Sequence, residues 1–314
     1  MTRYVVATAF GGPEVLSVLD EQLGQPGAGQ VRLDVRAAGV NPVDHKLYGG
    51  MFGTDPSQLP MRLGSEASGV ISAVGEGAAG PAGPVQVGDE VIVYRAPGAH
   101  AEQLLVDAGA VLPKPAAMTF EQAAGLMLTG TTAIHLLVAT GVGHGDTVLV
   151  HGAAGGVGLM VVQIAKARGA HVIGTASTGN HVALQRYGVT PVEYGDGLVE
   201  RIRELSEDVT VALDCVGSDE AVDASLELVA DRGRVATIAA FGRAPEAGIK
   251  ALGGGPGADA GTAVRDAARL ELVSLVEEGQ LEVTVAATYD LADVAAAHRS
   301  VQDNHTHGKV VLIP

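Results

Sequence analysis

Cysteine is almost absent from this chain, which has only Cys215 among 314 residues. A single cysteine excludes an internal disulfide and is typical of a protein of the reducing cytoplasm. Basic residues are also scarce, with 20 Lys and Arg against 36 Asp and Glu, and the formal net charge is -16. Because nucleic acids and anionic membranes bind basic surfaces, neither is expected as a partner.

The sequence also lacks a signal-like N-terminus and any long apolar run. We therefore expect a soluble, cytoplasmic protein without a membrane span. Hydrophobic residues make up 47% of the chain and charged residues 18%, which is ordinary for a globular enzyme and unlike a disordered chain. The length predicts about two domains, each large enough for its own core.

The most informative segment is Thr147–Ala176. It opens with Thr147–His151, a short apolar run rich in β-branched residues, which indicates a strand buried on both faces. A glycine-rich turn follows, then apolar residues at helical spacing over Leu159–Arg168, and a second apolar strand at His171–Thr175. Strand, turn, helix and strand in this order make a βαβ unit.

The glycine-rich turn is typical of dinucleotide binding. Gly155 and Gly156 let the backbone approach a pyrophosphate, and Gly158 lets the helix pack closely on the strand. Backbone amides at the helix N-terminus then face the phosphate charge. A turn that only packs is the alternative, and Ala153 stands where the first glycine of the fingerprint is expected. The expected phosphate contacts are Ala154, Gly155, Gly156 and Val157.

The end of the second strand bears on the choice between NAD and NADP. NAD-binding folds usually place Asp or Glu there, to bind the ribose 2′-hydroxyl. The segment Gly174–Asn180 contains no acid, which removes the repulsion against a 2′-phosphate and favours NADPH. It contains no Lys or Arg either, so Ser177, Asn180 and His181 would hold the phosphate through hydrogen bonds. Thr175, at the strand end, completes the expected contacts of this region.

Residues 1–115 are expected to be β-rich, because short alternating or apolar runs are separated by Gly and Pro turns. The expected strands are Tyr4–Ala9, Val31–Ala37, Gly69–Val74, Glu90–Tyr94 and Gln103–Val106. This pattern predicts a partly open antiparallel barrel. A helix is expected over Thr119–Ala139, where Thr119 and Gln122 have the spacing of a capping box.

Strands and helices alternate from Thr147 to Ile238, which predicts a parallel, doubly wound sheet. Gly253–Gly257 is expected to be a surface loop, with a substrate lid as the alternative. The rest of the chain predicts a helix at Arg265–Glu278, a strand at Leu281–Ala286, a helix from Leu291 and a strand at Lys309–Ile313. With two strands left after the parallel sheet, we expect the C-terminus to fold back onto the first domain.

Several separated motifs resemble one known family. They are AAGVNPVD (37–44), GSEASGVISAVG (64–75), VGDEV (87–91), LTGTTA (128–133), HGAAGGVG (151–158) and GKVVLIP (308–314). In order and spread they resemble the zinc-independent quinone oxidoreductases of the medium-chain dehydrogenase/reductase superfamily. The resemblance implies an α/β fold with a GroES-like β-barrel catalytic domain at residues 1–120 and 266–314, and a doubly wound Rossmann NADP-binding domain at residues 121–265. It also implies an active site in the cleft between the domains, and a homodimer.

The residue types argue against a zinc site. Zinc-dependent relatives use a Cys where this chain has Asn41 and a His where it has Ser65, and the four-cysteine structural site is missing. Catalytic zinc requires three protein ligands from Cys, His, Asp or Glu. Cys215, at a predicted strand end, is interpreted as a small buried hydrophobe. We therefore expect no metal.

The resemblance places Asn41 beside the nicotinamide ribose and carboxamide, in a loop supported by Asp44. An ordinary turn is the alternative for Asn-Pro. Tyr48 stands where the family often has Arg, and it would either donate a proton to a reduced carbonyl oxygen or only line the pocket. His45 is a weaker proton donor, and bulk water could serve instead.

Further cofactor contacts follow from position in the family pattern, and several lie at carboxyl ends of predicted strands, where ligands bind in such sheets. They are Thr129, Tyr194, Val216, Gly217, Ala239, Phe241 and Lys309. Thr129 could instead serve helix packing, and Tyr194 could be a partly buried strand-end aromatic. For Lys309, a phosphate contact and an edge-strand lysine are both considered.

Together these observations predict an NADPH-dependent, metal-free reductase that transfers a hydride to a quinone or an α,β-unsaturated carbonyl compound. One alternative is an enoyl reductase acting on a polyketide or acyl intermediate, although an acidic chain offers no basic docking patch for a carrier protein. Another is a non-catalytic NADPH-binding protein. A zinc alcohol dehydrogenase is the least favoured, because the ligands are missing.

Overall fold

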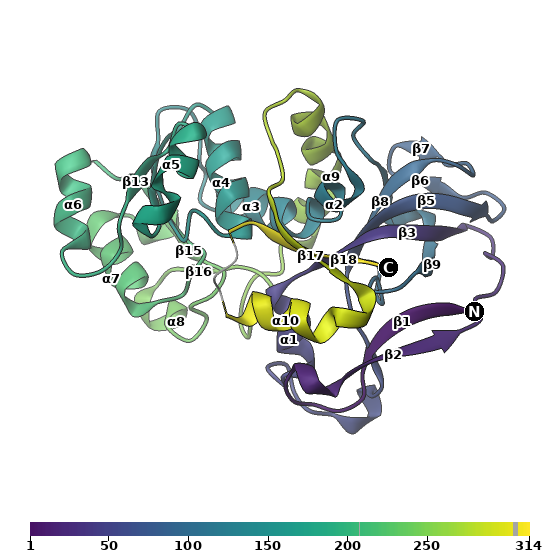
Figure 1. The fold of residues 1–314 in the computed structure, drawn as a ribbon. Coiled ribbons are helices and arrows are strands. Elements are labelled where there is room, and N and C mark those ends of the chain that lie inside the picture. Colours follow the sequence, from purple (N-terminus) through teal and green to yellow (C-terminus); the bar gives the residue numbers. More distant parts are fainter. Residues whose placement is uncertain (207, 304–306) are drawn as a thin grey trace. The chain divides into compact units, whose positions relative to one another are not determined.

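The computed structural model describes residues 1–206, 208–303 and 307–314. The chain forms two compact units, of which unit 1 comprises Met1–Leu128 and Arg269–Pro314 and unit 2 comprises Thr129–Ala268. The C-terminal segment folds back onto the N-terminal part, as predicted. Its last strand, β18 (Lys309–Ile313, yellow in Figure 1), pairs with β3 (Gln30–Val40, purple).

Unit 1 consists mainly of β-strands. Its other strands are β1 (Thr2–Ala7), β2 (Leu16–Glu21), β4 (Met61–Arg62), β5 (Glu66–Val74), β6 (Ala79–Gly80), β7 (Gly83–Pro84), β8 (Glu90–Tyr94), β9 (Gln103–Asp107), β10 (Val111–Pro113) and β17 (Val285–Asp290). A seven-stranded sheet has the order β10-β8-β5-β3-β18-β17, with β9 also paired to β3, and a three-stranded sheet has the order β2-β1-β4. Helices α1 (Pro42–Tyr48), α2 (Phe120–Ala123) and α10 (Val294–Gln302) belong to the same unit.

Neighbouring strands in the seven-stranded sheet run antiparallel, except β17 and β18, which run parallel. A parallel pair requires a crossover connection, and α10 supplies it. The pairing of the N-terminal strands is antiparallel, as predicted.

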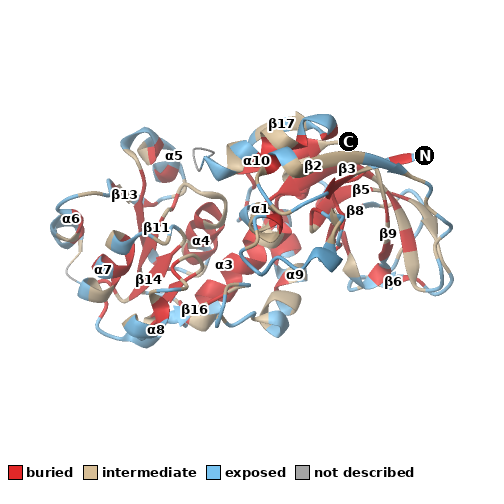
Figure 2. Ribbon diagram, turned by 90° about the horizontal axis from the view of Figure 1, so that it is seen from below, coloured by how far each residue is buried: buried red, intermediate tan, exposed pale blue. Residues whose placement is uncertain are grey.

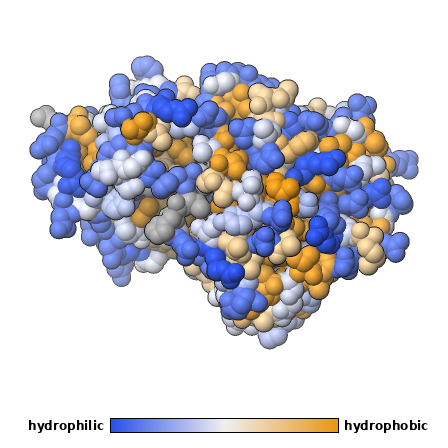
Figure 3. Space-filling model, viewed as in Figure 1, coloured by the Kyte–Doolittle hydropathy of each residue, from blue (hydrophilic) through white to orange (hydrophobic). Residues whose placement is uncertain are grey.

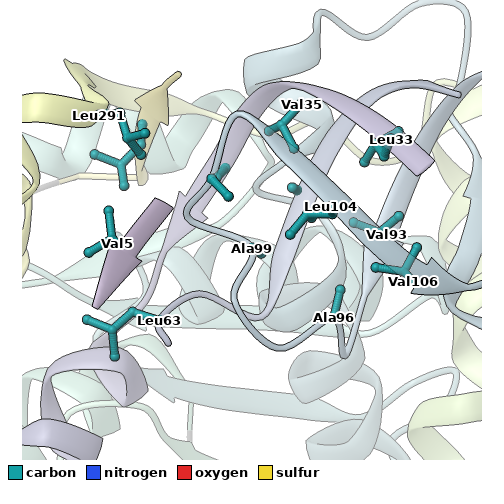
Figure 4. Packing of buried hydrophobic residues seen from close by; sticks show 14 of the residues in the cluster. Val5, Leu33, Val35, Leu63, Val93, Ala96, Ala99, Leu104, Val106 and Leu291 are labelled. Atoms are coloured by element: carbon teal, nitrogen blue, oxygen red, sulfur yellow. The ribbon is translucent and has the colours of Figure 1, made fainter. Parts of the chain in front are cut away.

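The core of unit 1 is built by alternation along the strands. In β3, Val31, Leu33 and Val35 are buried, with exposed fractions of 0%, 0% and 7%, and these alternate residues share one face. Figure 4 shows Leu33 and Val35 on the same ribbon, within a cluster that includes Val93 and Leu104 from other strands. Burial of side chains this size contributes about 1.5–3 kcal/mol each.

Unit 2 contains a six-stranded parallel sheet with the order β13-β12-β11-β14-β15-β16. The strands are β11 (Thr147–His151), β12 (His171–Thr175), β13 (Thr190–Val192), β14 (Val211–Asp214), β15 (Val235–Thr237) and β16 (Lys250–Ala251). The helices are α4 (Gly156–Ala167), α5 (His181–Arg186), α6 (Leu198–Leu205), α7 (Asp219–Leu228) and α8 (Ala244–Ala247), while α3 (Met127–Ala139) and α9 (Thr262–Glu277) cross the unit boundaries. The predicted doubly wound sheet is confirmed, and its strand order reverses between β11 and β14, where such sheets bind ligands.

The central strand β11 is buried on both faces, as predicted. Val148, Leu149 and Val150 are each 0% exposed, and in Figure 2 the central strands of this sheet are red. A continuous apolar run is needed at this position because helices cover both faces of a parallel sheet. The bounds of β11 and β12 agree with the sequence prediction.

The sequence predicts one helix over Thr119–Ala139, and this is wrong, because the structure has the separate helices α2 and α3. The predicted start is confirmed, since Thr119 caps α2 and the Gln122 side chain completes the capping box. The interruption includes Gly125, where a Cβ atom would lie 2.8 Å from Cγ of Lys309. The break between α2 and α3 thus lies against Lys309, which is far away in the sequence, so the local spacing of apolar residues could not predict it.

The units divide at 128/129, whereas the family resemblance implies a domain boundary at 120/121. The reason is that α2 packs on β3 and β5 of unit 1. At the other end, the units divide at 268/269, within α9, rather than at 265/266.

The surface mixes polar and apolar side chains, as the face in Figure 3 shows. The large hydrophobic residues that are exposed include Val182, Tyr194 and Val216, with exposed fractions of 73%, 56% and 46%. Among the described residues, none of the helices combines the length and the apolar character needed to cross a membrane.

Gly158 is the residue through which α4 packs on the turn after β11, and we predict that Gly158→Ala destabilises unit 2. An added Cβ would overlap the Gly152 carbonyl oxygen and lie 2.8 Å from Cα of Ala153. Overpacking of this kind costs about 1–3 kcal/mol. The free energy of unfolding, measured by urea denaturation, is expected to fall by this amount.

The matched control is Gly143→Ala, since a Cβ at Gly143 meets nothing within 4 Å. This variant is expected to change the stability by less than about 0.5 kcal/mol. Equal stability of the two variants would contradict the close packing of α4 on the turn.

Candidate active site

The glycine turn of unit 2 joins β11 to α4 and is tied to the end of β12. The backbone N–H of Gly152 donates to Thr175 Oγ1 over 3.2 Å, and the N–H of Ala153 donates to the Thr175 carbonyl over 3.0 Å. Thr175 is only 3% exposed, so these two hydrogen bonds hold the turn against the buried end of β12. Gly155 is the N-cap of α4 and offers no side-chain acceptor to the first amides, an arrangement suited to an anion at the helix N-terminus.

Two loops at the carboxyl ends of β14 and β15 are held by one polar network. Asp214 Oδ1 accepts hydrogen bonds from the backbone N–H groups of Val216 and Gly217, over 2.9 and 2.8 Å. Its Oδ2 accepts from Thr237 Oγ1 over 2.6 Å, and Thr237 Oγ1 accepts in turn from the N–H of Ala239 over 3.0 Å. Val216 and Gly217 thus bind the buried carboxylate directly, and Ala239 is linked to it through Thr237.

Asp214 and Thr237 were not among the predicted site residues. They are buried polar residues at the ends of two apolar strands, with exposed fractions of 1% and 0%. A buried polar group at a strand end needs partners, and this requirement is the signal that could have found them.

The turn after β12 is ordered by its own side chains. Asn180 Nδ2 donates to Ser177 Oγ over 2.9 Å, and Asn180 is 8% exposed. His181 Nε2 lies 3.3 Å from the Ala176 carbonyl oxygen. The structure therefore brings together Ser177, Asn180 and His181, the residues predicted for a 2′-phosphate, in one turn without a carboxylate.

Tyr194 lies on a short loop that two charged side chains hold in place. Arg201 Nη2 donates to the carbonyl oxygens of Glu193 and Gly195, over 2.8 and 2.9 Å. The N–H of Gly195 donates to Glu220 Oε1 over 2.7 Å. Because Tyr194 is 56% exposed, it is not the partly buried aromatic of the alternative interpretation, and its ring can receive a ligand.

Two further predicted residues of unit 2 have clear surroundings. Phe241 lies against the loop Gly253–Gly257, because a Cβ at Gly255 would lie 2.5 Å from the phenyl ring. Thr129, the second residue after the start of α3, is only 4% exposed. Thr129 is thus a buried helix residue.

In unit 1, Asn41 begins α1 and belongs to a buried polar cluster. Its backbone N–H donates to Asp44 Oδ2 over 2.7 Å, which completes a capping box. Its side-chain Nδ2 donates to Glu66 Oε1 over 3.0 Å, and its Oδ1 accepts from the ammonium of Lys309. Asn41, Asp44 and Glu66 are each no more than 1% exposed.

Lys309 and Glu66 form a buried ion pair within this cluster. Lys309 Nζ lies 2.9 Å from Glu66 Oε1, and Glu66 Oε2 accepts from the backbone N–H of Leu128 over 2.8 Å. The prediction of an edge-strand lysine is wrong, because β18 lies between β3 and β17. The ammonium faces Glu66 and Asn41 inside unit 1, so we do not retain the phosphate contact for Lys309.

Tyr48 is fully buried, and its hydroxyl lies 3.0 Å from Nδ1 of His298. Burial raises the pKa of the Tyr48 hydroxyl above its ordinary value of 10.0. Direct proton donation to a ligand from this position lacks access, which corrects the proposal that Tyr48 is catalytic. His45 is half-buried, and burial lowers its pKa below 6.5.

Two buried histidines lie beside Tyr48. The rings of His100 and His298 meet edge to face, with their centroids 5.5 Å apart, and His100 Nε2 lies 3.1 Å from the Gly39 carbonyl oxygen. Burial lowers the pKa of His100 to about 4 and that of His298 to about 3. Burial raises the pKa of Asp44 to about 7. Both histidines are therefore neutral at pH 7.

Comparison with known proteins adds the following. A family model described as alcohol dehydrogenase GroES-like domain matches residues 27–138, and one described as zinc-binding dehydrogenase matches residues 181–312. The quinone oxidoreductase of Pseudomonas aeruginosa is 34% identical, with 100% of both chains covered. The structure of Escherichia coli quinone oxidoreductase complexed with NADPH has a TM-score of 0.85 and 30% identity, with 99% of this chain and 100% of that chain covered.

The structure of an NAD-dependent alcohol dehydrogenase is also similar, with a TM-score of 0.86 and 29% identity over 99% of both chains. These matches support the predicted GroES-like unit and Rossmann sheet, which together make up the fold of this chain.

One of these family models is described as zinc-binding, so the fit of this chain to zinc needs to be tested. The family resemblance implies that Asn41 and Ser65 stand where zinc-dependent relatives have two zinc ligands, and neither side chain is a good ligand for zinc. The ammonium of Lys309 donates to Asn41 Oδ1 and would repel a cation there. Across the described residues, His, Cys, Asp and Glu side chains nowhere gather in threes to hold a metal. The residues present do not fit a catalytic zinc.

The buried histidines predict that the protein loses stability in acid. Between their folded pKa values and 6.5, the unfolded chain binds protons that the folded chain does not, so the free energy of unfolding falls as the pH falls. His151 acts in the same direction, since burial lowers its pKa to about 4. Asp44 acts in the opposite direction and offsets about one histidine, because its raised pKa lets the folded chain bind a proton that the unfolded chain does not bind. Each histidine contributes about 1.4 kcal/mol per pH unit from pH 6.5 down to about 4. Urea denaturation at a series of pH values measures this slope.

His298→Gln is expected to reduce the slope by about one proton, because Gln does not titrate. The control is His171→Gln, which replaces an exposed histidine and is expected to leave the slope unchanged. A wild-type slope in His298→Gln would show that this histidine does not carry the effect.

Proposed function

Because the chain belongs to the quinone oxidoreductase family of the medium-chain dehydrogenases/reductases, we propose that it is an NADPH-dependent reductase of quinones or α,β-unsaturated carbonyl compounds. The observation that carries this proposal is the glycine turn at the strand-order reversal, followed by an acid-free turn after β12. The similar Escherichia coli quinone oxidoreductase is complexed with NADPH in its structure, which supports the same cofactor here.

Unit 2 provides the groups that bind the cofactor. The amides of Ala154–Val157 at the start of α4 would hold the pyrophosphate. The turn of Ser177 and Asn180 would donate hydrogen bonds to the 2′-phosphate, and the exposed ring of Tyr194 would contact the adenosine. The loops at the ends of β14 and β15 would contact the nicotinamide half through Val216, Gly217, Ala239 and Phe241.

Asn41 and Thr129 are the residues that the family resemblance implies for the nicotinamide end. NADPH supplies the hydride when it is bound, and the protein contributes position and electrostatics. Holding donor and acceptor in register accounts for much of the rate in such reactions. Because the Tyr48 hydroxyl is buried against His298, the proton for the reduced acceptor would come from His45 or from water.

The proposal extends to the setting of the protein. An acidic chain with one cysteine supports a cytoplasmic enzyme whose partner is a small molecule rather than a nucleic acid or membrane. The family resemblance supports a homodimer. Turnover without added metal is part of the same proposal, because Asn41 and Ser65 do not fit zinc.

The direct test is oxidation of NADPH, followed by its loss of absorbance, against a panel of quinones and enones. We expect turnover with at least one acceptor and no effect of a chelator, since no step requires a metal. Turnover with acyl-thioester substrates alone would favour the enoyl reductase alternative. Tight NADPH binding with no turnover on any acceptor would favour the non-catalytic alternative.

The acid-free turn predicts that a single carboxylate changes the cofactor preference. Ser177→Asp retains an acceptor for Asn180 Nδ2 and adds a negative charge where the 2′-phosphate is proposed to bind. The ratio of kcat/KM for NADPH to that for NADH is expected to fall by about tenfold or more, which corresponds to about 1.4 kcal/mol.

Ser177→Asn is the matched control, because it has the shape of Asp without the charge. Its NADPH preference is expected to stay near that of the wild type. An unchanged ratio in Ser177→Asp would place the 2′-phosphate elsewhere.

A further inference from the structure

Lys309, which the proposed function leaves without a role, has an unusual environment. It is a lysine with 4% exposure on a strand that lies between β3 and β17, and its ammonium has two oxygen partners, Asn41 Oδ1 and Glu66 Oε1. A buried ammonium is costly unless it is paired and hydrogen-bonded. Glu66 provides the charge, but Asn41 provides a neutral acceptor that charge balance alone does not require.

The two partners fix the orientation of the Asn41 amide. The ammonium donates to Oδ1, and the carboxylate of Glu66 accepts from Nδ2 over 3.0 Å. If the amide were flipped, its NH2 group would face the ammonium and its carbonyl oxygen would face the carboxylate. Both contacts would then be repulsive, so only one orientation is stable.

The same ion pair also reaches the start of α3. Glu66 Oε2 accepts from the backbone N–H of Leu128 over 2.8 Å, and Leu128 directly precedes Thr129 in the chain. A carboxylate at the first turn of a helix is favoured by the free amides and the helix dipole. Lys309 is therefore linked to Asn41 directly, and through Glu66 to the N–H of Leu128.

We propose that Lys309 is a positioning residue for the nicotinamide half of NADPH, acting by fixing the Asn41 amide and the Glu66 carboxylate. This inference rests on the proposed function. It goes beyond that function because it assigns to a buried lysine of the last strand a role separate from charge balance. A lysine that only neutralised Glu66 would leave the orientation of Asn41 without consequence for the cofactor.

The experiment compares Lys309→Met, Glu66→Gln and the double variant Lys309→Met/Glu66→Gln. Lys309→Met leaves an unpaired buried carboxylate, so it is expected to be strongly destabilised. The double variant has no buried charge at this place and is expected to recover most of the stability. In it, the introduced glutamine can accept from the Leu128 N–H and donate through its side-chain amide to Asn41 Oδ1, which requires the flipped Asn41 amide.

The double variant thus separates the two roles of Lys309. If Lys309 positions Asn41, the double variant recovers most of the stability but loses about 10- to 100-fold in kcat/KM, the loss expected from a misplaced contact. Its Kd for NADPH is expected to rise, while its Kd for adenosine 2′,5′-bisphosphate, which has no nicotinamide, is expected to stay unchanged. Recovery of both stability and wild-type kcat/KM would overturn the proposal and leave charge balance as the role of Lys309.

The matched control is Lys114→Met in the same unit. The side chain of Lys114 is 5% exposed and its Nζ lies 3.1 Å from Glu90 Oε2, but it belongs to no cluster with Asn41. Its loss is expected to leave both Kd values at their wild-type level. An equal rise of the NADPH Kd in Lys114→Met would mean that loss of any buried lysine has this effect, and would overturn the proposal.

Failure of the proposed function gives a different result. If the wild type binds NADPH but reduces no acceptor, the proposed function fails, while the two Kd measurements still decide the role of Lys309. If the double variant keeps the wild-type Kd for NADPH, the role of Lys309 fails, whatever the acceptor panel shows.

Discussion

The buried ion pair between Lys309 and Glu66 is the interaction on which the organisation of unit 1 depends. It joins the last strand of the chain to β5, and both partners also bind Asn41. A buried charge pair adds little net stability compared with apolar residues, but removal of one partner costs about 3–5 kcal/mol. Such a pair therefore specifies which segments of the chain pack together, and contributes little to the free energy of unfolding.

A comparable constraint acts in unit 2, through Asp214 and Thr237. Their side chains satisfy the backbone N–H groups of the two loops that follow β14 and β15. Loops at the end of a parallel sheet have no ladder to satisfy their amides, and a buried carboxylate substitutes for it. The two loops are thus ordered before any ligand binds, which lowers the entropic cost of binding.

The parts of the structure that follow local rules could be predicted from the sequence. The bounds of β11, β12, β8 and β18 agree, because a run of apolar or alternating residues is a short-range signal. The short strands β10, β13 and β16 were missed, since three or fewer residues carry no periodicity. The parallel pair of β17 and β18 was missed because strand pairing depends on distant residues.

The candidate site shows the same division between features set by adjacent residues and features set by distant ones. The glycine turn and the acid-free turn could be read from the residues, because their chemistry is contained in adjacent positions. The partners of Lys309 could not, since Asn41 and Glu66 are more than two hundred residues away in the chain. The burial of Tyr48 against His298 was equally beyond local reasoning. In this chain, the sequence predicts where a cofactor phosphate could bind. It does not predict which distant side chains hydrogen-bond to one another.

The inner position of β18, between β3 and β17, has a consequence for the newly made protein. Residues of β3 at Ala38–Val40 pair with Leu312, Val311 and Val310, which the ribosome adds long after β3. Unit 2 ends at Ala268, so it can fold while unit 1 still lacks an inner strand. During that interval the open edge of β3 is a template for wrong pairing with other nascent chains. Asn41, the next residue after that edge, gains its lysine partner only once β18 has been made, so until then nothing from β18 fixes the orientation of its amide.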